Sequence, residues 1–401
     1  MYFKNVNRIE FLNLIFLAAI SIFAISIFFL NFDTPWKHFS DQTQSFLHGR
    51  LDANPLDFDK HDYVIKDGKY YWPEGPFPSV LLLPFQFLFG SNFQQGIMQL
   101  ILIVILLLSL FKLARIKEFN FPDSLYLTAA FLMGSPVVGL IVDPKSWFFA
   151  QVVTVTTLTL LLLELETKRR LLLIGILEAA LIATRPTSGF IILALVVLLY
   201  IKKEPLQRKI NRVIPFLIPL FISLVALMWF NYARFGNLVD NGYLKNDVGG
   251  FIDPLRSLGL FSLQHIPTNF YYYFLASVEP ITSNISVHLK FPYIKYSEWG
   301  LSLLFVAPFF LYSVRSLKKT TGYLKSLWLV VVVTLFVQLS YYAPGWVQFG
   351  PRYTADFMPI LYLLTLYALN RPKLTGFQKI LITVSSLFNV YLLTTHILLQ
   401  G

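Results

Sequence analysis

Apolar stretches of about 20 residues recur along the whole chain, and no other feature limits its fold as strongly. A helix of that length covers the hydrocarbon core of a bilayer. The composition agrees, since 56% of the 401 residues are hydrophobic and only 14% are charged. A soluble domain of this length could not bury so much apolar surface. The sequence therefore predicts an all-α polytopic membrane protein that forms one domain over residues 1–401.

Basic residues give the expected orientation of the spans. We expect about 11 spans, near 10–30, 94–114, 123–142, 147–166, 171–184, 187–201, 213–233, 297–317, 325–343, 353–370 and 376–399. Every second gap is basic, as at Arg115 and Lys117 and again at Lys318 and Lys319. Because basic residues collect in cytoplasmic loops, the N-terminus is expected in the cytoplasm and the C-terminus outside. The same rule accounts for the net charge of +11 without nucleic acid.

Two long segments, 31–93 and 234–296, then fall on the outer face. The first contains the apolar stretch Val80–Phe89, which is too short to span and is expected to form a surface helix. Two expected spans are also short, and Arg185-Pro186 separates them. Short, proline-interrupted hydrophobic segments often mark a site within the membrane.

The first outer loop is rich in carboxylates. Its acidic side chains are Asp41, Asp52, Asp57, Asp59, Asp62, Asp67 and Glu74. A protein that only spans lipid has no need for so many charges there, so we expect chemistry or recognition at the membrane surface.

Five phrases of the sequence carry a family resemblance when they are taken in order. They are SDQTQSFLHGRLD (40–52), DYVIKDGKYYWPEGPFPSVLLLPFQFLFG (62–90), ATRPTSG (183–189), NYARFGNLVDNGY (231–243) and QFGPRYTADFMP (348–359). Together they resemble GT-C superfamily membrane glycosyltransferases, which include protein O-mannosyltransferase-like and aminoarabinose-transferase-like families. The resemblance is to bacterial members.

The resemblance implies a GT-C-type bundle whose outer loops carry short surface helices. It also implies a hexosyl- or pentosyltransferase that takes sugar from a polyprenyl-phosphate carrier, with inversion, to an acceptor hydroxyl on a glycan, lipid or protein. The expected location is the plasma (inner) membrane of a prokaryote, with the active site outside. In this superfamily an acid just after the first span serves as catalytic base or metal-associated carboxylate, and Asp41 matches it. Many members carry a second acid next to it, where this chain has Gln42.

Arginines within the same phrases are candidates for the donor phosphate, because negative charge builds on the departing phosphate and a guanidinium grips it with two donors. These candidates are Arg185, Arg234 and Arg352. The candidates for substrate binding are Glu74, Trp72, Tyr353 and Gln348. Of these, Trp72 offers a ring on which a sugar can stack, and Glu74 offers a hydrogen-bond acceptor.

A divalent metal is left open, with His38, Asp41 and Glu74 as its candidate ligands. The chain has no cysteine, and no histidine spacing matches an established zinc pattern. A structural alternative accompanies each main candidate. Asp41 could cap a helix, Arg185 could pair with Asp143 or Asp356, and the outer aromatic residues could form an interfacial belt.

Two other functions stay open. A lipid-linked saccharide flippase or transporter would also use broken helices and a buried arginine. A non-catalytic membrane assembly factor would keep the fold without the chemistry, and Gln42 at the position of the second acid keeps that alternative open. No phosphate-cradling glycine loop, serine-nucleophile elbow or HExxH helix occurs, so the sequence gives nucleotide hydrolysis and proteolysis little support.

Overall fold

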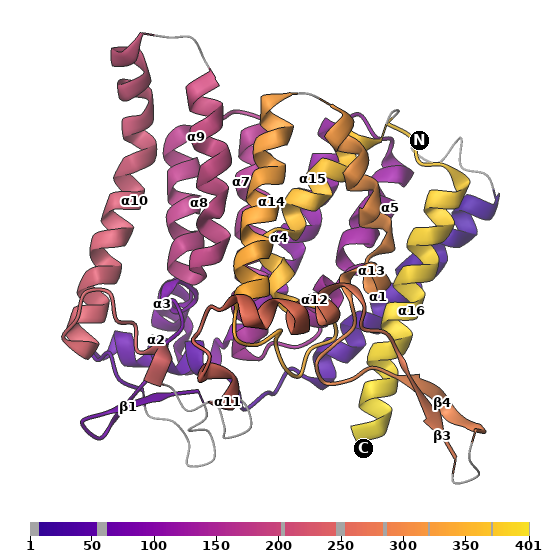
Figure 1. Cartoon of the computed structure of the whole chain (residues 1–401), viewed down its shortest axis with the longest axis horizontal. Coiled ribbons are helices and arrows are strands. Elements are labelled where there is room, and N and C mark those ends of the chain that lie inside the picture. Colours follow the sequence, from indigo (N-terminus) through magenta and orange to yellow (C-terminus); the bar gives the residue numbers. More distant parts are fainter. Residues whose placement is uncertain are drawn as a thin grey trace.

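The computed structural model of the chain describes residues 8–53, 62–201, 205–245, 253–283, 287–319, 321–369 and 372–400. Helices dominate these ranges (Figure 1). Up to residue 201 the α-helices and 3-10 helices (η) are α1 (Arg8–Leu30), α2 (His38–Leu47), α3 (Phe77–Phe89), η1 (Gly90–Asn92), α4 (Gln95–Ile116), α5 (Phe121–Leu132), α6 (Val137–Ile141), α7 (Ser146–Glu166), α8 (Leu171–Thr184), η2 (Pro186–Ile191) and α9 (Ile192–Ile201). Those that follow are α10 (Leu206–Phe235), η3 (Tyr243–Lys245), α11 (Asp253–Arg256), η4 (Leu263–His265), α12 (Ile266–Phe274), α13 (Leu303–Val306), η5 (Pro308–Lys318), α14 (Gly322–Ser340), η6 (Arg352–Asp356), α15 (Met358–Ala368) and α16 (Gly376–Gln400).

Six described helices are long and apolar enough to cross a membrane. They are Glu10–Leu30, Gln95–Ile116, Ser146–Glu166, Val213–Phe235, Gly322–Ser340 and Gly376–His396. Shorter apolar helices cover Leu171–Thr184, Pro186–Leu198 and Met358–Ala368. The chain is therefore an integral membrane protein with an all-α membrane part, as the sequence predicts. The count of about 11 spans stays a prediction.

Several expected spans are interrupted rather than continuous, and proline accounts for the breaks. The span expected at 123–142 divides into α5 and α6, with Pro136 between them. The span expected at 297–317 consists of the short α13 and then η5, which begins at Pro308. Because proline lacks an N–H and clashes with the preceding turn, it ends or loosens an α-helix without changing how apolar the segment is.

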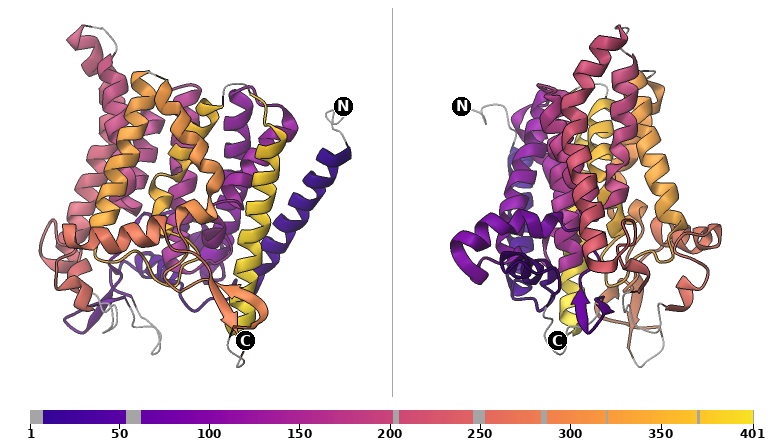
Figure 2. Two further views of the ribbon diagram at one scale, coloured as in Figure 1. Left: turned by 45° about the vertical axis from the view of Figure 1, so that its right-hand side comes forward. Right: turned by 90° about the vertical axis from the view of Figure 1, so that its left-hand side faces the viewer.

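The long helices lie side by side, and most of the short elements gather at one end of them (Figures 1 and 2). That end, the lower one in Figure 1, carries α2, α3, α11, α12 and two antiparallel hairpins, and we call it the loop face. The hairpins pair β1 (Val64–Lys66) with β2 (Lys69–Tyr71) and β3 (Glu279–Thr282) with β4 (Leu289–Lys295). The helix expected at Val80–Phe89 is α3, which begins three residues earlier, at Phe77.

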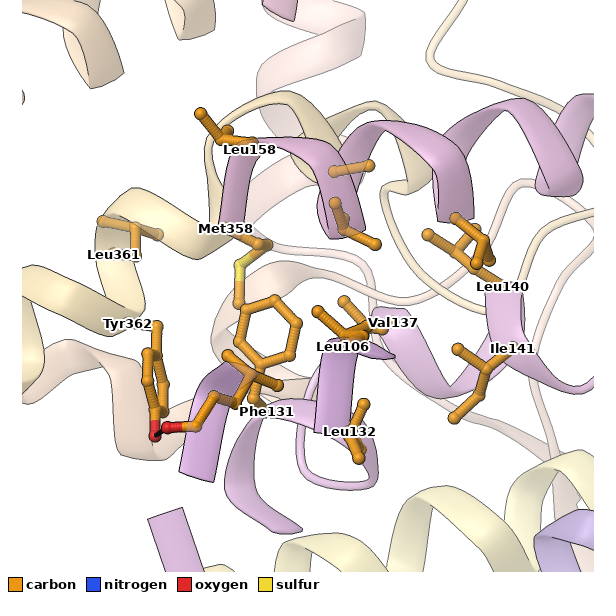
Figure 3. Close-up of a cluster of buried hydrophobic side chains, with 14 of the residues drawn as sticks. Leu106, Phe131, Leu132, Val137, Leu140, Ile141, Leu158, Met358, Leu361 and Tyr362 are labelled. Atoms are coloured by element: carbon orange, nitrogen blue, oxygen red, sulfur yellow. Dashed lines mark hydrogen bonds between the residues drawn. The ribbon is translucent and has the colours of Figure 1, made fainter. Parts of the chain in front are cut away.

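One part of the apolar core lies between α4, α5, α6, α7 and α15 (Figure 3). Phe131, Leu158 and Met358 meet there without exposure to solvent. The hydroxyl of Tyr362 donates to the backbone carbonyl of Leu110 at 3.0 Å, so its one polar group is satisfied inside the bundle. Packing against η5 and α7, together with this hydrogen bond to α4, holds α15, the helix that follows η6.

Candidate functional site

A cavity of about 790 Å³ lies near the loop face. Its walls come from the segment after β2, the junction of α8 and η2, the end of α10, the end of α14 and the start of η6. Six of the candidate phosphate-binding and substrate-binding residues line it: Trp72, Glu74, Arg185, Arg234, Arg352 and Tyr353. Asp62, another acid of the first outer loop, lines it as well. Segments far apart in the chain thus bring most of the candidate site together.

Glu74 reaches the cavity because the chain after β2 packs tightly against the end of α8. A Cβ on Gly75 would lie 2.3 Å from the carbonyl oxygen of Ala183, so only glycine allows this approach. Among the described residues, the partly buried Glu74 carboxyl has no hydrogen bond or ion pair. Burial raises its pKa above the ordinary value, although the nearby charges of Arg185 and Arg352 oppose that shift.

Arg185 lies at the break between α8 and η2 and forms an ion pair with Asp356. Its Nε donates to Asp356 Oδ1 at 2.8 Å, and its Nη2 donates to Oδ2 at 3.3 Å. The hydroxyl of Thr187 and the side-chain amide of Gln338 donate to the same carboxylate at 2.5 and 3.2 Å. The structural alternative that pairs Arg185 with Asp356 is therefore confirmed, and most of the Arg185 charge is neutralised.

Arg352 differs from Arg185 in having no acidic partner within the described ranges. Its Nε is buried and makes no hydrogen bond to the described residues. The guanidinium carbon lies 5.3 Å from the ring centre of Tyr353, and that of Arg185 lies 5.2 Å from the same ring. Tyr353 thus contacts two guanidinium groups, of which only that of Arg352 is left to attract an anion.

Arg234 holds a wall of the cavity in place. It is buried, with 3% of its surface exposed, and its Nη1 donates to the carbonyl of Trp72 at 2.8 Å. Its remaining groups donate to the Phe230 carbonyl at 3.2 Å and to Asn231 Oδ1 at 3.1 Å. The Arg234 guanidinium therefore donates its hydrogen bonds to neutral acceptors. These bonds tie the segment before Glu74 to α10.

An aromatic cluster backs the same wall. The ring of Trp72 stacks on His38 with their centres 4.0 Å apart, and the Nδ1 of His38 lies 2.9 Å from the Ser146 hydroxyl. Trp147 also packs at the edge of Trp72 and lines the cavity. The buried indole N–H of Trp72 has no hydrogen-bond partner among the described residues. His38 therefore supports Trp72 from behind and does not line the cavity.

The structure places Asp41 and Gln348 outside this cavity. Asp41 lies in the first turn of α2 and lines a separate pocket. The alternative that Asp41 caps a helix is wrong, because α2 begins at His38 and Asp41 lies inside it. Gln348 donates to the carbonyls of Trp299 and Pro344 at 2.9 and 3.1 Å and accepts from the backbone N–H of Arg352 at 3.1 Å, so it shapes the loop that leads into η6.

The metal candidates His38, Asp41 and Glu74 are not brought together. Within the part of the chain that the structure describes, no three His, Asp or Glu side chains are grouped closely enough to hold a metal ion. Two acidic residues of the first loop, Asp57 and Asp59, lie outside the described residues.

The cavity also contains residues that sequence reasoning assigned to a belt or did not single out. The hydroxyls of Tyr243 and Tyr341 lie 2.6 Å apart and both rings line the cavity. Tyr341 is one of the outer aromatic residues for which an interfacial belt was the structural alternative, and Tyr243 ends the fourth phrase of the family resemblance. The signal for both was weak, because aromatic residues are common at any membrane surface.

The chain was compared with known proteins in three ways. No protein-family model, no curated protein and no solved structure matches it.

Proposed function

We propose that the chain is a glycosyltransferase that moves a sugar from a polyprenyl-phosphate carrier to an acceptor hydroxyl on the outer face of a prokaryotic plasma membrane. One observation carries the proposal. An aromatic-lined cavity holds a carboxyl group and a guanidinium group, Glu74 and Arg352, neither of which has a partner of opposite charge among the described residues. Transfer of a sugar from a phosphate needs a base and a cation in one cavity.

Arg352 is the group that we assign to the donor phosphate. Because Asp356 neutralises Arg185, the net attraction for an anion comes mainly from Arg352. A guanidinium binds phosphate oxygens with parallel N–H donors, and these bonds strengthen as negative charge builds on the leaving phosphate. In this proposal Arg185 is a positioning residue that holds η6 through Asp356 and so orients Arg352, which begins that element.

Glu74 is the group that we assign to the acceptor. The acceptor hydroxyl would attack the anomeric carbon and give its proton to the Glu74 carboxylate. The bond between that carbon and the phosphate oxygen would break, and the phosphate would leave with the bonding electrons. A raised pKa makes Glu74 a stronger base than an ordinary carboxylate, which favours this role. Asp41, which the family resemblance suggests as base, lines a different pocket.

Aromatic side chains support a sugar as the group that is transferred. Trp147 offers a ring face, and the paired hydroxyls of Tyr243 and Tyr341 offer hydrogen bonds. Apolar side chains from α10 and α14, including Leu227 and Val337, line another part of the same cavity and would meet the first isoprene units of the carrier.

The test is transfer of labelled sugar from a panel of polyprenyl-phosphate donors in membranes. The native chain is compared with Glu74→Gln, Asp41→Asn and Arg352→Gln. The control is Glu279→Gln, because Glu279 is an exposed acid of the loop face that lies outside the cavity and 3.9 Å from Lys295. We expect transfer by the native chain, the control and Asp41→Asn, and loss of transfer in the other two variants.

Each deviation from that pattern has a distinct meaning. If transfer survives in a folded Glu74→Gln variant but is lost in Asp41→Asn, the catalytic base is Asp41 and not Glu74. If the chain moves the donor across the membrane without transferring its sugar, and Glu74→Gln does not affect this movement, the chain is a flippase and not a glycosyltransferase.

A further inference from the structure

A second pocket, of about 170 Å³, lies at the loop face and differs in character from the large cavity. Every described side chain that lines it is hydrophilic: Lys37, Ser40, Asp41, Gln44, Gln86, Ser91, Asn92 and Gln94. They come from α2 and the residue before it, from α3, from η1 and from the residue just before α4. The chain is 56% hydrophobic, yet none of the described residues that line this pocket is apolar.

Hydrogen bonds within the protein hold the walls of this polar pocket in place. The side-chain amide of Gln44 donates to Gln86 Oε1 at 2.8 Å, and Gln86 in turn donates to the carbonyl of Phe93 at 3.0 Å. Gln86 is only 2% exposed, so its position is fixed by packing as well as by these bonds. The Ser40 hydroxyl accepts from the backbone N–H of Gln95 at 2.8 Å, which joins α2 to the start of α4. The pocket therefore needs little rearrangement to receive a ligand.

The lipid surface is adjacent to this pocket. At the end of α3, Phe87, Leu88 and Phe89 are 77%, 70% and 63% exposed, which in a membrane protein indicates contact with lipid. Figure 2 (right) shows a helix of this part of the chain projecting sideways from the lower end of the bundle. Gln86 and Ser91, on either side of this apolar tip, both line the pocket. A molecule in the pocket would thus lie at the depth of lipid headgroups.

We propose that the polar pocket binds the sugar headgroup of a glycolipid. Amide and hydroxyl side chains both donate and accept hydrogen bonds, as sugar hydroxyls require. One ammonium group, on Lys37, and one carboxylate, on Asp41, give the lining no net formal charge, so an anionic phosphate headgroup gains no particular attraction. The acyl chains of the glycolipid would lie along Phe87–Phe89. This inference is independent of the proposed sugar transfer, since no described residue lines both cavities.

The full chain, placed in nanodiscs, tests this assignment. Each nanodisc contains phosphatidylcholine and three test lipids in equal amounts. These are monoglucosyl diacylglycerol, diacylglycerol with the same acyl chains, and phosphatidylglycerol. Lipid that stays with the protein after extraction is identified by native mass spectrometry. We expect the native chain to retain the glucolipid in preference to the other two. Soluble methyl glucoside added in excess tells whether the sugar alone suffices, since it would then displace the glucolipid.

Two variants on the pocket rim test the assignment, and one variant outside the pocket is the control. Asp41→Asn and Asn92→Ala should each lower retention of the glucolipid about five- to tenfold, the effect of losing one ligand hydrogen bond. Gln264→Ala, at an exposed amide outside the pocket, should leave retention unchanged. Equal retention of glucolipid and diacylglycerol by the native chain would overturn the inference. So would a preference that persists in both rim variants.

Discussion

The ion pair between Arg185 and Asp356 leads to a contrast between two arginine variants of the same cavity. The Asp356 side chain has no exposed surface and that of Arg185 is 16% exposed, so this pair is largely removed from water. Arg185→Gln would leave the Asp356 carboxylate buried with only neutral donors, from Thr187 and Gln338. Removing one partner of a buried ion pair costs about 3–5 kcal/mol of stability. Arg352→Gln breaks no ion pair among the described residues and should cost no more than about 1 kcal/mol.

Thermal unfolding of the purified chain in detergent measures this difference in stability. Binding of a polyprenyl phosphate measures how much each variant weakens the affinity for the anion. Arg352→Gln should weaken that binding about 10- to 150-fold, because a hydrogen bond to a charged group contributes about 1.5–3 kcal/mol. The double variant Arg185→Gln/Asp356→Asn should recover part of the stability that Arg185→Gln loses, since no charge is then left unpaired. Equal loss of stability in Arg185→Gln and Arg352→Gln would refute the assignment of one arginine to structure and the other to the anion.

Three further changes separate the roles of other residues. Burial raises the pKa of Glu74 above 4.5, so the folded chain holds the proton of this carboxyl more tightly than the unfolded chain does. Stability should therefore fall as the pH rises from 4.5 through the folded pKa. Glu74→Gln should flatten this slope in melting curves taken across pH. Gly75→Ala would force a Cβ to within 2.3 Å of the Ala183 carbonyl oxygen. The melting temperature should therefore drop by the equivalent of about 1–3 kcal/mol, and sugar transfer should fall with it. An unchanged melting temperature would contradict this packing. Tyr362→Phe removes a buried hydrogen bond to Leu110 and should cost about 1 kcal/mol while transfer in the same preparation stays as in the native chain.

The membrane class could be predicted from the sequence because it depends on summed hydrophobicity, which needs no tertiary contact. The breaks could be predicted only in part. The short segments around Arg185-Pro186 gave a local signal, and the structure has a helix end there. At Pro136 and Pro308 the surrounding residues are as apolar as a continuous span, so hydropathy alone joined the pieces.

The candidate site was predictable where a local signal marked a residue. Arg185 is expensive to place near lipid, Arg352 has polar neighbours in the fifth phrase, and Glu74 lies three residues before the surface helix α3. The position of Asp41 could not be predicted in this way. The buried face of α2 includes Phe39, Gln42 and Thr43, and this leaves Asp41 on a face that lines the polar pocket. Which face of a short helix meets which cavity depends on packing with α3, over 30 residues away in the chain.

The contact between Gly75 and the end of α8 also constrains how the sequence can change over evolution. The contact is made by a backbone carbonyl of Ala183, so the identity of that side chain does not affect it, whereas Gly75 has no permitted substitute. A relative that retains the cavity should therefore keep glycine at this position even where residue 183 has drifted to serine, valine or leucine. The two segments would show no covariation despite lying in direct contact, and a search for paired substitutions would miss the junction that brings Glu74 to Arg185. A set of relatives with varied residues at position 75 and an intact Glu74 would contradict this expectation.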